Sequence, residues 1–198
     1  MKKKRLDEQI KEKNIKIICE KMNKFVFFIS LFFILLYIPF SFTVYSHSYH
    51  KYNFLNQDIS SEIKNEDILV ADKNLINYFL HKEKLNEMWN INEKKHMEDV
   101  RNIYDCLLIL FFIFLIISFF YSKLSLKYIN KKFLEKCLKI NILITISLLF
   151  IIPFFSYFWN NIFHKIMFNN KFWIYKNGDM SYYLFPNEFF LNSLIFII

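Results

Sequence analysis

Apolar residues in this chain are gathered into long blocks that charged segments separate. Residues 25–44 carry no charge and can cross a hydrocarbon core of roughly 30 Å as one helix. Residues 103–122 and 138–158 form two further blocks of this kind. A fourth block starts at residue 189, but the sequence stops at residue 198, after about half the length that a crossing needs. We therefore expect an all-α membrane protein, a four-helix transmembrane bundle whose last helix is truncated because the sequence is clipped or the protein is a shortened variant.

The segment between the first two blocks, residues 45–102, has a helical pattern of its own. We expect Asn65 to cap a helix whose apolar stripe is Ile68, Leu69, Leu75, Ile76, Phe79 and Leu80. A second helix should begin with Asn90 as its cap and Glu93 three positions later, which is the spacing of a capping box. No Pro or Gly lies between Asn90 and residue 121, so this helix should run unbroken into the second apolar block. The segment therefore reads as a small helical cap on one side of the membrane.

The distribution of charge predicts the orientation of the chain. Residues 1–24 hold nine Lys and Arg against four acids, and residues 123–139 hold six Lys against one acid. Residues 45–102 hold eight Lys and Arg against ten acids, and residues 159–188 hold three Lys against two acids. Cytoplasmic segments carry the excess of positive residues, so the N-terminus should be cytoplasmic. This topology explains the formal charge of +8, because the basic residues lie where they meet the anionic lipids of the inner leaflet. Nucleic acid need not be a partner.

These patterns divide the chain into segments with distinct expected positions. In order they are a basic cytoplasmic tail (1–24), a first span (25–44), the extracytoplasmic helical cap (45–102), a second span (103–122), a basic cytoplasmic loop (123–137), a third span (138–158), an extracytoplasmic interfacial loop (159–188) and the start of a fourth span (189–198).

Two histidines stand close to the expected outer surface of the membrane. Glu93, His96 and Asp99 are spaced three apart on one helix face, so Asp99 can hydrogen-bond one imidazole nitrogen of His96 and raise the basicity of the other. His164 follows the third span by six residues within an aromatic segment typical of the headgroup zone. Read singly, each is also compatible with an ordinary surface or interface histidine. The predicted topology nevertheless brings both to the same level on different helices, where they can converge.

Other motifs carry less chemistry. Pro39 and Pro153 should kink the ends of two spans and could open a crevice there. His47 and His50 have a spacing compatible with a metal, but no third ligand is near in sequence and HExxH is absent. The single glycine excludes a glycine-rich phosphate loop, and no GxSxG motif is present.

Two stretches resemble the signatures of a known family. They are "E-x-x-H-M-x-D-V-R" from Glu93 to Arg101, and "F-H-K-I-M-F-N-N-K-F-W" from Phe163 to Trp173, followed by Asp179 and by "F-P-N-E-F-F" around Pro186. Together with the order of helices and loops, they resemble the lipoprotein intramolecular transacylase family of Gram-positive bacteria over nearly the whole chain. The resemblance implies transfer of the sn-2 acyl chain of a diacylglyceryl lipoprotein to the α-amine of its N-terminal cysteine, which gives a lyso-form lipoprotein.

The resemblance also implies roles for particular residues. We expect His96 and His164 as the catalytic pair, with Glu93, Asp99 and Arg101 in support and with Trp173, Asp179 and Pro186 at the substrate or interface. The oxyanion could be held by Lys95, by Arg101 or by the helix start at 92–93. The expected partners are a diacylated lipoprotein and the lipids of the cell membrane, with the site on the outer face and with no cofactor or metal.

Two other functions stay open at this point. The protein could be a non-enzymatic adaptor whose outer cap binds a partner, in which case the histidines are incidental. It could also be a metal-dependent membrane hydrolase, which would need more ligands than the sequence brings together.

Overall fold

The computed structural model describes residues 2–55, 63–124 and 131–198, and these residues form helices and no strand. Residues 125–130 of the expected cytoplasmic loop and residues 56–62 of the expected cap lie outside the described residues. The chain divides into two compact units, one made of residues 1–35 and 110–142 and the other of residues 36–109 and 143–198. Each unit is considered separately below.

The first unit contains parts of three helices, α1 (Lys2–Tyr45), α4 (Ile91–Leu124) and α5 (Lys131–Ser147). Phe33 of α1 meets Phe114 of α4 with 5.0 Å between ring centroids. Phe27 of α1 lies 6.2 Å from Phe133 of α5 by the same measure. Many other apolar side chains of this unit are exposed, Phe112 among them. An apolar surface of this extent is typical of helices that face lipid.

Three helical stretches are long and apolar enough to cross a membrane. They are Asn23–Tyr45, Ile91–Phe120 and Lys131–Met167. The first and third contain the predicted spans 25–44 and 138–158, and the second overlaps the predicted span 103–122 up to Phe120. The fourth apolar block forms α9 (Asn187–Ile197), an apolar helix of 11 residues. Helix α4 runs without a break from the charged turns around His96 into its apolar part, as its sequence predicts.

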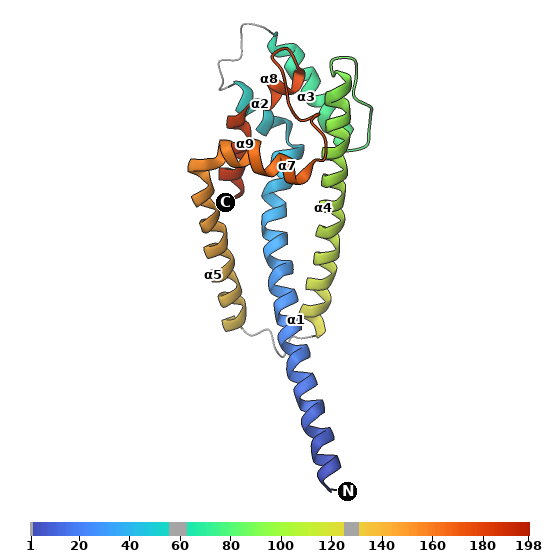
Figure 1. Cartoon of the computed structure of the whole chain (residues 1–198), viewed down its shortest axis with the longest axis vertical. Coiled ribbons are helices and arrows are strands. Elements are labelled where there is room, and N and C mark those ends of the chain that lie inside the picture. Colours follow the sequence, from blue (N-terminus) through green and yellow to red (C-terminus); the bar gives the residue numbers. More distant parts are fainter. Residues whose placement is uncertain (1, 56–62, 125–130) are drawn as a thin grey trace. The chain divides into compact units, whose positions relative to one another are not determined.

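The second unit holds the expected cap as a compact cluster of helices. Helices α2 (His47–Leu55), α3 (Asn65–Phe79), α8 (Met180–Leu184) and α9 gather there (Figure 1). A shared apolar core holds them together, and its buried members include Val44, Phe54, Ile68, Ala71, Leu75, Phe79, Trp89, Met97, Met180 and Leu184. Burial of one such large side chain is worth about 2 kcal/mol, so this core accounts for the compactness of the cluster.

Helix α3 confirms most of its predicted stripe and corrects two details. Ile68, Leu75, Ile76 and Phe79 are buried, whereas Leu80 is 41% exposed because the helix has already ended. Asn65 is wrong as the cap: it is the first helical residue, and the residue before it makes no side-chain capping bond. Two acidic residues in the first turn favour this helix end by their interaction with the helix dipole.

The third apolar block differs from a regular helix. After α5 the chain passes through a 3₁₀ segment, η1 (Leu148–Phe154), a short turn α6 (Phe155–Tyr157), a π-helix η2 (Phe158–Phe163) and α7 (His164–Met167). Pro153 lies in the 3₁₀ segment, and a proline there removes one N–H donor and crowds the preceding turn. Through η2 and α7, helical backbone continues past residue 158 into the segment predicted as an interfacial loop.

Candidate active site

His96 lies on the second turn of α4, and a capping box holds the start of that helix. The side-chain Oδ1 of Asn90 accepts hydrogen bonds from the N–H groups of Asn92 (2.9 Å) and Glu93 (3.0 Å). In return, Oε2 of Glu93 accepts the N–H of Asn90 at 2.8 Å. The capping box predicted from the sequence is therefore confirmed, and it places His96 one turn beyond a rigid helix end.

Glu93 also ties this helix to α8. Its second carboxylate oxygen, Oε1, accepts the N–H of Ser181 at 2.7 Å, and the side chain is 2% exposed. Both oxygens are thus engaged by backbone donors. The support that Glu93 gives the site is positional, because it holds the starts of two helices together.

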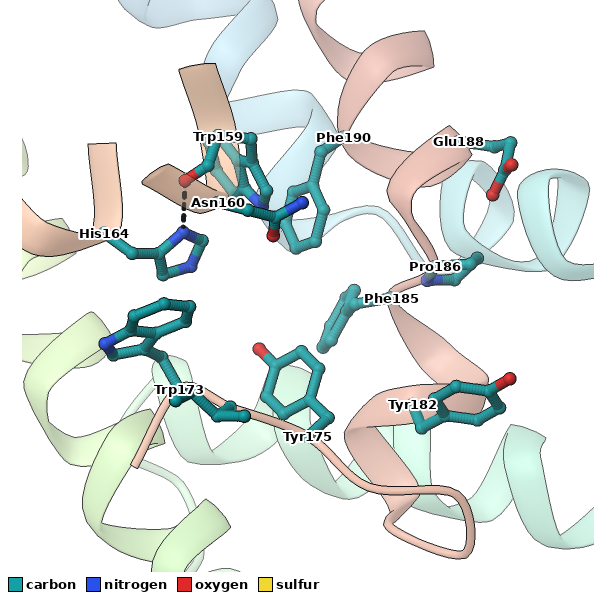
Figure 2. Close-up of a pocket in the computed structure, with 11 residues that line it drawn as sticks. Trp159, Asn160, His164, Trp173, Tyr175, Tyr182, Phe185, Pro186, Glu188 and Phe190 are labelled. Carbon is teal, nitrogen blue, oxygen red and sulfur yellow. Dashed lines mark hydrogen bonds between the residues drawn. The ribbon is translucent and has the colours of Figure 1, made fainter. Parts of the chain in front are cut away.

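His164 is oriented by the π-helix that precedes it. Its Nδ1 donates a hydrogen bond to the backbone oxygen of Trp159 at 2.8 Å, and the same oxygen accepts the backbone N–H of His164. The proton on Nδ1 leaves a lone pair on Nε2, which Figure 2 shows on the cavity side of the ring. Trp173 stacks on the imidazole with 4.7 Å between centroids and 27° between planes. Single π-turns are frequent at functional sites, and here the turn fixes the tautomer of the histidine.

The two histidines converge, as predicted. Their ring centroids are 6.3 Å apart, with 38° between the ring planes, and both side chains are buried. Phe168 packs against both rings, with centroid distances of 4.8 Å to His96 and 5.8 Å to His164. Burial lowers the pKa of each imidazole below its ordinary value, and the nearby His164 lowers the pKa of His96 further. The arrangement therefore favours two neutral imidazoles that can exchange protons with a substrate.

The predicted hydrogen bond between Asp99 and His96 is wrong. Oδ2 of Asp99 accepts a hydrogen bond from the side-chain amide of Asn170 at 2.8 Å, and Nδ1 of His96 is buried without a partner. The backbone oxygen of Asn170 accepts the indole N–H of Trp173 at 2.9 Å. Asp99 instead holds the turn that carries Trp173, and Trp173 stacks on His164.

The basic residues considered for the oxyanion lie against aromatic rings outside the cavity. The guanidinium carbon of Arg101 lies 4.1 Å from the ring centroid of Tyr78 on α3. The ammonium of Lys95 lies 5.0 Å from the ring centroid of Phe172. Both contacts are cation–π interactions on neighbouring segments, and neither residue lines the cavity beside His164.

A cavity of about 410 Å³ opens beside His164 (Figure 2). Three predicted residues, His164, Trp173 and Pro186, line it. The remaining lining residues are Trp159, Asn160, Ile174, Tyr175, Tyr182, Phe185, Glu188 and Phe190. Pro39 and Pro153 do not line this cavity. The cavity is therefore not the crevice that was expected at the kinked ends of the two spans. The mostly aromatic wall suits an apolar chain with a polar head.

Asp179 does not line the cavity either, although the sequence resemblance placed it at the substrate or interface. Its Oδ1 accepts the side-chain amide of Asn90 at 2.8 Å, and its Oδ2 accepts the N–H of Lys176 at 2.7 Å. Gly178, with φ of 96°, supplies the left-handed residue that this turn requires. Asp179 therefore closes the turn before α8 and ties it to the start of α4.

Tyr175 is the site residue that the sequence reasoning missed. Its ring centroid lies 6.1 Å from that of His96, and its hydroxyl points toward His164 and Trp173 in Figure 2. Burial raises the pKa of Tyr175 above its usual value, and nearby Tyr104 and Glu93 raise it further. The hydroxyl therefore stays protonated and can donate a hydrogen bond. The signal available in the sequence was the position of Tyr175 between two aromatic motifs, Phe163 to Trp173 and Phe185 to Phe190.

A second polar cluster in this unit was also missed. Asp72 on α3 is fully buried, and its two carboxylate oxygens contact Nδ1 of His47 and Nδ1 of His50. The other ring nitrogen of His50 meets the backbone oxygen of Thr43 at 2.8 Å. Within the described parts of the chain, no group of three or more His, Cys, Asp and Glu side chains is arranged to hold a metal ion. The cluster fastens α2 to α3.

Comparison with known proteins decides the family. The family described as "Lipoprotein intramolecular transacylase Lit" matches residues 24–190. The chain belongs to this family. As a member of the transacylase family it is an acyltransferase, and the comparisons give no support to a non-enzymatic adaptor. None of the curated proteins compared with the chain matches it.

Solved structures of a transacylase from Bacillus cereus share the fold. The membrane-integral lipoprotein intramolecular transacylase Lit of that organism is 23% identical, with a TM-score of 0.77 over 90% of this chain and 89% of that chain. A variant of it with one histidine changed to arginine is 22% identical, with a TM-score of 0.75 over 96% and 90% of the two chains. A variant with a histidine changed to alanine is 21% identical, with a TM-score of 0.77 over 94% and 88%. The membrane-integral fold of these relatives agrees with the three apolar helices found here.

Proposed function

We propose that this chain moves the sn-2 acyl chain of a diacylglyceryl lipoprotein to the α-amine of its N-terminal cysteine, with His96 and His164 as the proton-transfer pair. The observation that carries the proposal is the convergence of two buried imidazoles, 6.3 Å apart by ring centroids. One of them, His164, lines an aromatic cavity of about 410 Å³, and His96 lies next to it, outside the cavity lining. Family membership supplies the reaction class, and the site supplies residues that fit it.

The chemistry needs a base and then an acid. An α-amine has a pKa near 8, so much of it is protonated at neutral pH and must lose a proton to attack an ester. One imidazole accepts the amine proton as nitrogen attacks the ester carbon. The resulting imidazolium returns a proton to the glycerol oxygen as the carbon–oxygen bond breaks, which leaves an amide, a free hydroxyl and the starting histidines.

His164 is suited to the role of base. Its Nδ1 proton is committed to Trp159, so Nε2 carries the lone pair that accepts a proton. His96 lies close enough to share that proton and to help deliver it to the leaving oxygen. Because the amine and the ester belong to one substrate molecule, the cavity needs only to bind that molecule in a conformation that brings the two groups together.

The pattern of charge supports a position for the site on the outer face of the cell membrane. Residues 1–24 and 123–139 carry the excess of Lys and Arg, which favours the cytoplasm for both. The segments that hold His96 and His164 then face outward, where the lipid-modified end of a lipoprotein is found. Cysteine-accessibility labelling of single-cysteine variants in whole cells tests this topology.

The test of function is expression in a bacterial host that lacks the activity, followed by mass spectrometry of one lipoprotein's N-terminal peptide. Wild type should convert the diacylglyceryl form to the lyso form. His96→Ala and His164→Ala should each lower conversion by about 10²-fold or more, because general acid–base help is worth about 10²–10⁴-fold.

His81→Asn is the matched control for these variants. His81 is exposed, its Nε2 lies 3.0 Å from Oδ1 of Asp105, and its φ of 57° is one that asparagine tolerates. This variant should retain conversion. Normal lyso-form lipoprotein from either site variant, at membrane levels equal to wild type, would refute the assignment.

A further inference from the structure

The proposed reaction creates a negative charge that the two histidines do not neutralise. When the amine attacks, the ester carbonyl oxygen becomes an oxyanion, and catalysis of acyl transfer depends on a hydrogen-bond donor placed beside it. The donors expected from the sequence do not line the cavity. Lys95 and Arg101 lie over aromatic rings, and the N–H groups at the start of α4 donate to Oδ1 of Asn90. The donor must come from another part of the site.

Several polar groups of the cavity wall are also engaged. The indole N–H of Trp173 donates to the backbone oxygen of Asn170 at 2.9 Å. The side-chain amide of Asn160 donates to the backbone oxygen of Ser156 at 3.1 Å. These bonds hold the wall in place and turn the two groups toward the backbone.

The Tyr175 hydroxyl differs from them. Among the described residues it has no hydrogen-bond partner, and Figure 2 shows it directed into the space beside His164 and Trp173. Its raised pKa keeps it protonated, so it is a donor throughout the neutral range. Tyr182 lines the same cavity, but it is 48% exposed, and Figure 2 shows its hydroxyl directed away from His164.

We propose that Tyr175 is a further catalytic residue, whose hydroxyl donates a hydrogen bond to the oxyanion formed at the ester carbon. The inference rests on the acyl transfer proposed above. The amine nitrogen bonds to the carbonyl carbon and the carbonyl electron pair moves to oxygen, where Tyr175 stabilises it. The pair returns as the glycerol oxygen leaves. Tyr175 keeps its own proton throughout, while the histidines handle the proton of the amine.

The experiment compares Tyr175→Phe with Tyr52→Phe, which also removes one tyrosine hydroxyl but at an exposed position on α2 that does not line the cavity. Purified protein in detergent micelles acts on a synthetic lipopeptide with an S-diacylglyceryl cysteine and a free α-amine, and kcat and KM are measured by mass spectrometry. Loss of one oxyanion donor costs about 10²–10³-fold in kcat, so Tyr175→Phe should lose about 10²-fold in kcat with KM within about threefold. Tyr52→Phe should stay within about threefold of wild type in both.

Each outcome decides something. A Tyr175→Phe kcat within threefold of wild type, with His164→Ala inactive, overturns the role of Tyr175 and leaves the proposed function standing. A loss carried by KM alone also overturns it, because it shows ground-state binding. Full activity of both Tyr175→Phe and His164→Ala would refute the proposed function itself. Phenylalanine keeps the ring, and thermal unfolding of each variant, expected to match wild type, separates a catalytic loss from a folding defect.

Discussion

Replacement of Glu93 by alanine tests how the site is held together. The variant removes two acceptors, one for the N–H of Asn90 and one for the N–H of Ser181. Asn90 is exposed, so water can replace its lost partner and the cost there is about 1 kcal/mol, as for a helix cap. Ser181 is fully buried, and an unsatisfied buried donor costs about 2–3 kcal/mol. We expect a total loss of about 3–4 kcal/mol in the free energy of unfolding.

The assay is unfolding in detergent by titration with sodium dodecyl sulfate, followed by tryptophan emission, to which the buried Trp89 contributes. Glu98→Ala is the control, because Glu98 is exposed on the same helix and its loss should change stability by about 0.5 kcal/mol or less. If Glu93→Ala unfolds at the same detergent composition as the control, the carboxylate does not join α4 to α8, and the account of how His96 is positioned is wrong.

Two further variants test other supports of the site. Asp72→Ala leaves His47 and His50 without their shared acceptor. Because His50 is buried, the free energy of unfolding should fall by about 3 kcal/mol in the same titration. An unchanged midpoint would contradict this expectation. Trp173→Leu removes the ring stacked on His164, so lipopeptide conversion should fall on the order of 10-fold at an unchanged membrane level, and full conversion would show that the stack does not orient the imidazole.

The sequence predicts well those features that depend on neighbours along the chain. The first three apolar blocks reappear in helical stretches long enough to cross a membrane, and the capping box of Asn90 and Glu93 starts α4 where its spacing requires. The convergence of His96 and His164 was also predictable, because the topology predicted from charge assigns both helix ends to one level. Local periodicity and charge distribution are sufficient for each of these features.

Contacts between distant segments were not predictable in this way. Asp99 is three residues from His96, yet it bonds Asn170, which is 71 residues away, because tertiary packing offers a better-placed donor. Asp72 meets His50 across 22 residues for the same reason. The inward direction of the Tyr175 hydroxyl depends on how the turn before α8 is closed, and spacing carries no information on that turn.

The central claim is that His96 and His164 act together on one proton path, and a double-mutant cycle tests it most directly. Initial rates on the synthetic lipopeptide are measured for wild type, His96→Ala, His164→Ala and the double variant. Residues that work as a unit are strongly non-additive, so the double variant should lose no more activity than the more damaged single variant. If instead the two losses multiply in the double variant, the histidines act independently, and the shared proton path is contradicted.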